Sequence, residues 1–269
     1  MLRFLDARTG EPVPAAPARR GLTRIEAHAS GLDPTALRVL LTADLLVRGL
    51  ELSGTPVWTI LTAPHRHAEL RAAATTLSIR PFEDGRDLAS GLGEAQAIHV
   101  TSDPGNVPTA GPVMRVAPVE WTTDPAGAPA PGPAPAGAGG AGAAEPAVHP
   151  ALPVLLTDPA ALRLALLSVP RGDTVRLDPV VLGEAAGRLA RWRRAVAGWA
   201  RQPSRPVPDG VRGRLRSAWE DDLDLPGVLD VLRSVAADPD ISDGARFETY
   251  VYADRLLALD LARDLGSLA

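Results

Sequence analysis

Histidine is the side chain in this sequence best suited to chemistry at neutral pH, and the chain has five histidines. His28 ends a predicted strand, at the sheet edge where open α/β folds bind ligands. It could contact a ligand there or be a partly buried structural residue. His65 and His67 follow a second predicted strand and could share a metal ion, but no third ligand is apparent, and exposed loop histidines are the alternative. His99 stands in an apolar strand, which favours a core histidine.

Other reactive side chains give weaker patterns. No serine lies in a G-x-S-x-G motif, so the sequence does not support a hydrolase triad. An acidic cluster could bind a divalent cation, or it could form a structural turn whose last Asp caps the next helix. We favour the structural turn for this cluster, which consists of Glu220, Asp221, Asp222 and Asp224.

Two residue types are missing, and their absence excludes several kinds of site. The chain has no Cys, so it has no disulfide, thiolate nucleophile or Cys-ligated zinc. It also has no Lys, which excludes a P-loop lysine and a Schiff-base lysine. The formal net charge of −4 argues against polyanion binding through bulk charge.

The N-terminal residues include no apolar signal region, and no run of 18 apolar residues follows. We therefore expect a soluble, cytoplasmic protein that does not associate with membranes.

The elements around His28 predict a β-α-β unit. Residues 22–29 form the first strand, and a helix opens at Asp33-Pro34, where Asp caps free amides and Pro loses no needed donor. The helix stops at Gly54, and residues 56–62 form a buried strand. This unit typically opens a doubly wound parallel sheet. The following elements are a helix over 65–77 and strands over 97–101 and 113–117.

An Ala/Gly/Pro segment divides the chain. Every residue from Pro125 to Ala144 is Ala, Gly or Pro, so none is large enough to anchor a core. We therefore expect a Rossmann-like nucleotide-binding-type domain over 1–121, a linker over 122–150 and an α-helical domain over 151–269.

The second half has helical periodicity. Asp158-Pro159 and Asp178-Pro179 repeat the helix start seen at Asp33-Pro34. The helix from Asp178 has an apolar stripe at 3-4 spacing: Leu182, Ala185, Leu189, Trp192, Val196 and Trp199. On its other side lie four arginines: Arg188, Arg191, Arg194 and Arg201. Further helices are predicted over 211–221, 226–237 and 242–265.

Three segments, in the same order, resemble cysteinyl-tRNA synthetases and the related ATP-dependent cysteine ligase of mycothiol synthesis. The first contains LRFLDARTGEPVP and ADLLVRGLELSGTPVW. The second runs from Asp158 to Ala197 and includes ALRLALLSVP. The third, Trp219 to Gly266, contains EDDLDLPGVLDVL and DRLLALDLA.

The resemblance implies a class I synthetase fold of the HUP type, with a Rossmann-like sheet followed by a stem-contact helical region. It also implies ATP as cofactor and four catalytic features, none of which is found. The HIGH element should fall at Asp33 to Ala36, which contain no histidine. The KMSKS loop should precede Ala161, but HPALPVLLTDPA has no Lys or Arg. The family's zinc site needs Cys, so we expect no zinc, and the middle of the family's catalytic domain looks shortened or replaced.

We therefore favour a degenerate relative without aminoacylation activity, which acts as a binding or regulatory module. The alternative is an ATP-dependent aminoacyl ligase or nucleotidyl transferase with altered active-site residues. Under this alternative, a nucleotide or aminoacyl-adenylate would bind near His28, Ser30, Asp33 and Thr35. A weaker alternative is RNA binding through the arginine face formed by Arg188, Arg191, Arg194 and Arg201, because the corresponding family region lies close to tRNA. That face is also explained as a solvated helix surface. The sequence identifies no catalytic residue and gives no oligomeric state.

Overall fold

The structure is a computed structural model that describes residues 1–17, 21–84, 94–123 and 148–266. We call the residues before 124 the sheet half and residues 148–266 the helical half. Residues 124–147 of the predicted linker lie outside the described residues. The predicted domain boundaries at 121 and 151 stay a prediction. One hydrophobic core cluster includes residues from both halves, from Leu2 to Leu261.

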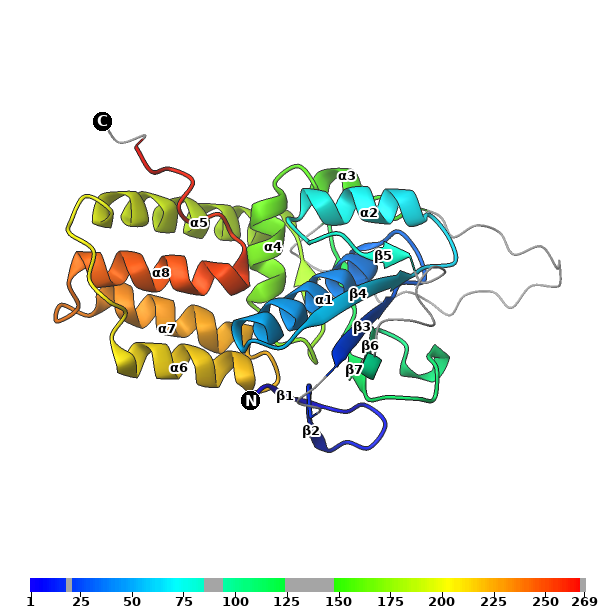
Figure 1. Ribbon diagram of the computed structural model, residues 1–269. Helices are drawn as coiled ribbons and strands as arrows, with labels where there is room; N and C mark the ends of the chain where they lie inside the picture. Colours follow the sequence, from blue (N-terminus) through cyan, green and yellow to red (C-terminus); the bar gives the residue numbers. More distant parts are fainter. Residues whose placement is uncertain (18–20, 85–93, 124–147, 267–269) are drawn as a thin grey trace, which may run out of the picture.

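A five-stranded parallel sheet forms the centre of the sheet half (Figure 1). Its strand order is β5-β4-β3-β6-β7. The chain starts in the middle at β3, moves outward through β4 and β5, and then crosses to β6 and β7. This is the strand order of a Rossmann-type sheet. All strands are parallel, and the chain switches from adding strands on one side of β3 to adding them on the other side, so the order reverses between β3 and β6. The strands are β3 (Leu22–His28), β4 (Val57–Thr62), β5 (Glu83–Asp84), β6 (Glu94–Thr101) and β7 (Val113–Arg115).

Helix α1 (Pro34–Leu52) follows β3 and begins and ends as predicted. The Asp33 carboxylate accepts the Ala36 amide at 2.8 Å, and Gly54 takes a left-handed φ of 78° just past the helix end. The helix packs against β3, β4 and β6 on one side and against α2 (His67–Thr76) and α8 (Asp243–Leu257) elsewhere. This surrounding contact explains why apolar residues occur nearly all round it.

Alternation along β3 separates the two faces of the sheet. Ile25 and Ala27 are fully buried in the core that includes α1. Arg24, Glu26 and His28 therefore point to the opposite face, where they are half-buried. The predicted burial of β4 was wrong for its first three residues, which are half-buried like those on this second face.

Several short elements had no counterpart in the sequence prediction. The N-terminus forms an antiparallel pair, and a parallel pair joins the sheet half to the helical half. These pairs are β1 (Arg3–Leu5) with β2 (Pro12–Pro14), and β8 (Val119–Trp121) with β9 (Val175–Leu177). The 3-10 helix η1 (Pro104–Asn106) and helix α3 (Leu152–Leu155) were also not predicted.

The helical half has the predicted helices. They are α4 (Pro159–Leu167), α5 (Pro179–Trp199), α6 (Asp209–Glu220), α7 (Leu225–Ala237) and α8. In Figure 1, α5 to α8 lie side by side, away from the sheet. The apolar stripe on α5 is confirmed: its tryptophans Trp192 and Trp199 meet Tyr250 of α8 edge-on, with ring centroids 6.0 and 5.1 Å apart.

The last helix ends earlier than predicted, at Leu257 instead of residue 265. Ala258 takes a left-handed φ of 47°, a conformation that ends the helix. The Asp254 carboxylate then accepts the amides of Leu259 at 2.7 Å and Leu261 at 2.9 Å. Leu259 and Leu261 are buried in loop conformation beyond the helix end, so their spacing looked like a continued helix, whereas Leu265 is exposed.

Among the described residues, no helix combines the length and the apolar character needed to cross a membrane.

A buried arginine joins the two halves. Arg163 of α4 is 1 % exposed and donates to the carbonyls of Leu257 at 2.6 Å and Leu77 at 2.8 Å. Its third partner is the Asp44 carboxylate on α1, at 3.2 Å. Burial lowers the pKa of Arg163 to about 10, and the charge of Asp44 opposes that shift, so the guanidinium is charged at neutral pH.

We predict that Arg163→Met destabilises the protein by about 2 to 5 kcal/mol, because it leaves the buried carbonyls of Leu257 and Leu77 without their donor and removes one of the cations paired with Asp44. Arg48 still pairs with the Asp44 carboxylate at 2.8 Å in this variant. Urea unfolding, monitored by circular dichroism, measures the change in the free energy of unfolding. The control is Arg176→Met, because Arg176 is 82 % exposed and its pair with Glu120 should contribute less than about 1 kcal/mol. Equal, small effects of the two substitutions would contradict this role for Arg163.

Candidate functional site

A small pocket lies at the carboxyl ends of β3, β4 and β6, next to the point where the strand order reverses. Open α/β sheets bind their ligands at this position. The pocket has a volume of about 150 Å³, which is below the roughly 300 Å³ where pockets for drug-sized ligands begin. It is lined by His28, Ala29, Ser30, Thr62, Pro64, Thr101, Ser102, Asp103 and Asn106. None of these lining residues is basic apart from His28.

Two of the four residues predicted to contact a nucleotide line this pocket, and two do not. His28 and Ser30 are in the lining. Asp33 caps α1, and the Thr35 hydroxyl accepts the Val119 amide of β8 at 3.0 Å. Asp33 and Thr35 therefore have structural partners, and neither lines the pocket.

The N-terminus of α1 is where a phosphate would be expected in this fold, because free amides and the helix dipole favour an anion there. Here the carboxylate of Asp33 already accepts the Ala36 amide, and a second negative charge at this helix end would be repelled. The described residues at this position therefore do not match a phosphate site.

The segment just before α4 meets the start of α1. The His149 amide donates to the Leu32 carbonyl at 3.1 Å, and Leu32, Ala151 and Leu152 are all buried in the core. The two places where the resemblance puts the HIGH and KMSKS elements are thus neighbours. Residues 149–160 contain no Lys or Arg.

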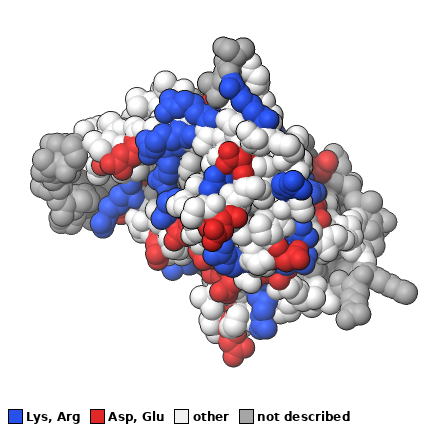
Figure 2. Space-filling view, turned by 90° about the vertical axis from the view of Figure 1, so that its left-hand side faces the viewer, with Lys and Arg blue, Asp and Glu red and all other residues white. Residues whose placement is uncertain are grey.

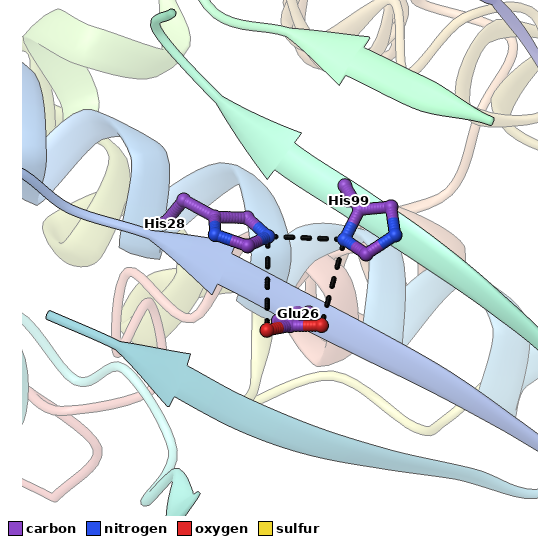
Figure 3. Close-up of side chains that lie close together, drawn as sticks. All are labelled: Glu26, His28 and His99. Carbon is purple, nitrogen blue, oxygen red and sulfur yellow. Dashed lines mark hydrogen bonds and ion pairs between the residues drawn. The ribbon is translucent and has the colours of Figure 1, made fainter. Parts of the chain in front are cut away.

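Three metal-ligating side chains meet on the second face of the sheet (Figure 3). His28 and Glu26 come from β3, and His99 comes from the paired position on β6, opposite Glu26. The His28 Nε2 and His99 Nδ1 atoms are 3.0 Å apart. The Glu26 carboxylate oxygens lie 3.9 Å from His28 Nε2 and 3.5 Å from His99 Nδ1. We call these three residues the Glu-His-His cluster.

The hydrogen-bond partners assign the tautomers of the two histidines. His99 Nε2 lies 2.7 Å from the Ala110 carbonyl, which only accepts, so this nitrogen has the proton and His99 Nδ1 is an acceptor. His28 Nε2 therefore donates to His99 Nδ1. Burial is the largest cause that lowers the pKa of His28, with His99 and Arg24 adding to the shift and Glu26 opposing it. The His28 imidazole is thus neutral at pH 7.

The structure places the other histidines and Glu26 as follows. His99 is 1 % exposed, so its prediction as a core residue is confirmed. Among the described residues, His65 and His67 join no group of three possible metal ligands. Glu26 was not identified from the sequence, although the spacing Glu26-x-His28 puts both side chains on one face of a strand.

The arginine face of α5 lies on the helical half. Arg191, Arg194 and Arg201 are exposed, whereas Arg188 is half-buried. Burial lowers the pKa of Arg188, and the nearby charge of Arg233 lowers it further. Figure 2 views this end of the molecule and shows basic side chains gathered at its upper left, with acidic and basic side chains mixed over the rest of the face.

The acidic cluster at 220–224 forms a structural turn. Asp224 caps α7 by accepting the Gly227 amide at 2.9 Å, as predicted. Asp222 accepts the Leu5 amide at 3.0 Å and pairs with Arg171. Glu220 pairs with the N-terminal ammonium group at 2.6 Å.

Comparison with known proteins gives partial relatives with the name L-cysteine:1D-myo-inositol 2-amino-2-deoxy-alpha-D-glucopyranoside ligase. The protein from Thermobispora bispora is 43% identical over 80 residues, which cover 30% of this chain and 19% of the relative. The Streptomyces griseus protein is 46% identical over 72 residues, 27% of this chain and 17% of the relative. The Acidothermus cellulolyticus protein is 35% identical over 104 residues, 39% of this chain and 25% of the relative.

No family model matches the chain. The matched stretches span between about a sixth and a quarter of these relatives' length. The chain is therefore a partial homologue of cysteine ligases, with an α/β fold built on a parallel sheet.

Proposed function

We propose that this chain is a ligand-binding relative of the cysteine ligases that does not activate an amino acid with ATP. Under this proposal the sheet half has the HUP-type class I fold, and the helical half is its stem-contact-like partner. The observation that carries the proposal is the contact between Leu32 and the segment beginning at His149. A backbone hydrogen bond joins there the two segments at which the resemblance expects the HIGH and KMSKS elements, and residues 33–36 and 149–160 contain no Lys or Arg.

Loss of these cations removes the main source of rate enhancement in phosphoryl and nucleotidyl transfer. Such reactions depend on positive groups that stabilise the charge developing on the phosphates. The negative carboxylate of Asp33 at the α1 N-terminus would repel the negative charge on the phosphates. The nearby pocket is small, and hydroxyl, amide and imidazole groups line it together with Asp103. We therefore propose that the pocket binds a small polar ligand, neutral or cationic, and not a nucleoside triphosphate.

The first test is amino-acid-dependent ATP–pyrophosphate exchange, with a cysteine ligase assayed in parallel as the positive control. We predict no exchange above background with cysteine or any other proteinogenic amino acid, because no adenylate forms. Turnover above background would contradict the proposal. It would favour the alternative of an ATP-dependent aminoacyl ligase or nucleotidyl transferase, and weaker exchange in His28→Ala would then place ATP at the pocket.

The second test isolates the charge of Asp33. In Asp33→Asn the N-cap is retained, since Asn caps as well as Asp, but the negative charge is removed. We predict unchanged thermal stability and about two- to five-fold tighter pyrophosphate binding, measured by NMR titration. The matched control is Asp158→Asn, which makes the same change at the N-cap of α4, where Asp158 accepts the Ala161 amide at 3.0 Å. An Asp33→Asn variant that binds pyrophosphate no better than wild type would show that this charge does not exclude the anion.

RNA binding through the arginine face is the weaker proposal, and its support is the exposure of Arg191, Arg194 and Arg201. It predicts that affinity for RNA falls steeply with salt. In Arg191→Glu/Arg194→Glu, the slope of log affinity against log salt should decrease by about 2. Fluorescence anisotropy over a salt series measures both quantities. An unchanged affinity and slope in this variant would remove the proposal.

A further inference from the structure

We propose that Glu26, His28 and His99 bind a divalent transition-metal ion, with zinc as the probe that tests it. This inference goes beyond the proposed function, because a metal site at the Glu-His-His cluster does not depend on whether ATP is used.

The donor set is one that transition metals prefer. Two imidazoles and one carboxylate are the protein ligands of several catalytic zinc and non-haem iron sites. In a tetrahedral zinc site with bonds of about 2.0 to 2.1 Å, ligand atoms are about 3.3 Å apart. The separations in the cluster are 3.0, 3.5 and 3.9 Å. The two longer separations go to different carboxylate oxygens of Glu26, and one ligand atom from each residue lies within 4.8 Å of the other two. A rotation of the Glu26 carboxylate toward the histidines would therefore place all three ligands around one ion.

The surrounding hydrogen bonds orient the ligands for a metal. Metal-ligating histidines almost always donate their other ring N–H to a carbonyl, carboxylate or water. His99 does so: Nε2 donates to the Ala110 carbonyl at 2.7 Å, which leaves Nδ1 facing the cluster. The Glu26 carboxylate accepts the Thr62 hydroxyl at 2.7 Å, which fixes its orientation.

The hydrogen bonds of the two histidines suit a metal site, because the Ala110 carbonyl holds the Nε2 side of His99 and leaves Nδ1 facing His28. Both face each other with one shared proton, on His28 Nε2, and the neutral ring can move that proton to its Nδ1 when Nε2 binds the ion. Figure 3 shows one nitrogen of each ring, His28 Nε2 and His99 Nδ1, and the carboxylate of Glu26 facing one another.

The site would remain open on one side. His28 belongs both to the cluster and to the lining of the 150 Å³ pocket. Three protein ligands leave a further coordination position for water or for a donor atom of a small molecule. His28 would then contact both the metal ion and the ligand in the pocket.

The experiment measures zinc binding to the tag-free, full chain by isothermal titration calorimetry, with Co²⁺ absorption as a second readout of His ligation. We expect one ion per chain and a rise in melting temperature with zinc. His28→Gln and Glu26→Gln should each weaken binding by more than about 10-fold, and Thr62→Val, which removes only the outer hydrogen bond, by about 10-fold. His28 and Glu26 are half-buried, so these variants are chosen over the buried His99.

The control is His65→Gln/His67→Gln, which removes the other closely spaced histidine pair and should leave zinc binding unchanged. Two results would overturn the proposal. Wild-type protein that takes up no zinc would show that the cluster is only a hydrogen-bonded structural group. Zinc binding that survives His28→Gln but is lost in the control would place the ion at His65 and His67. Neither result bears on ATP–pyrophosphate exchange, so the two proposals fail independently.

Discussion

The ion pair between Asp44 of α1 and Arg163 of α4 holds the sheet half against the helical half. Both side chains are about 1 % exposed, and the guanidinium also binds carbonyls from the ends of α2 and α8. A buried charge without its partner is costly, so few other arrangements of α1 and α4 satisfy all these groups. A second arginine, Arg38 of α1, donates to four carbonyls at Ala117, Val169, Pro170 and Asp173. Together the two arginines fix α1 against α4 and against the loop that follows α4.

The fold determines where a site lies, but it does not determine the chemistry of that site. The strand order and the pocket at its reversal are what an open α/β sheet provides for any ligand. The residues that meet there decide the reaction. At Leu32 and His149 to Leu152 the contact is apolar, and the α1 N-terminus is capped by a carboxylate. The ionisable groups of the sheet instead gather on its second face, at Glu26, His28 and His99.

Local signals made much of the fold predictable from the sequence. The three Asp-Pro pairs at Asp33, Asp158 and Asp178 all cap helices, because capping depends only on residues within one turn. The α5 stripe was predictable for the same reason. The end of α8 was not, because Ala258 takes a left-handed conformation that glycine usually signals.

The Glu-His-His cluster was beyond sequence reasoning for a different reason. Glu26 and His28 share a strand, but His99 joins them only through the parallel register that pairs it with Glu26, far away in the sequence. That register depends on which strands are neighbours in the sheet. The buried arginine contacts have the same character, since Arg163 and Asp44 are 119 residues apart.

The start of α1, with Asp33 as its cap, is the place where the fold would bind the phosphates of ATP, and we propose that it does not receive them. The most direct measurement is an amide NMR titration of the labelled chain with ATP in the presence of cysteine. We predict no saturable chemical-shift changes in the amides of residues 30–36, because the Asp33 carboxylate continues to accept the Ala36 amide. Saturable shifts of these amides, reversed by removing ATP, would contradict this conclusion.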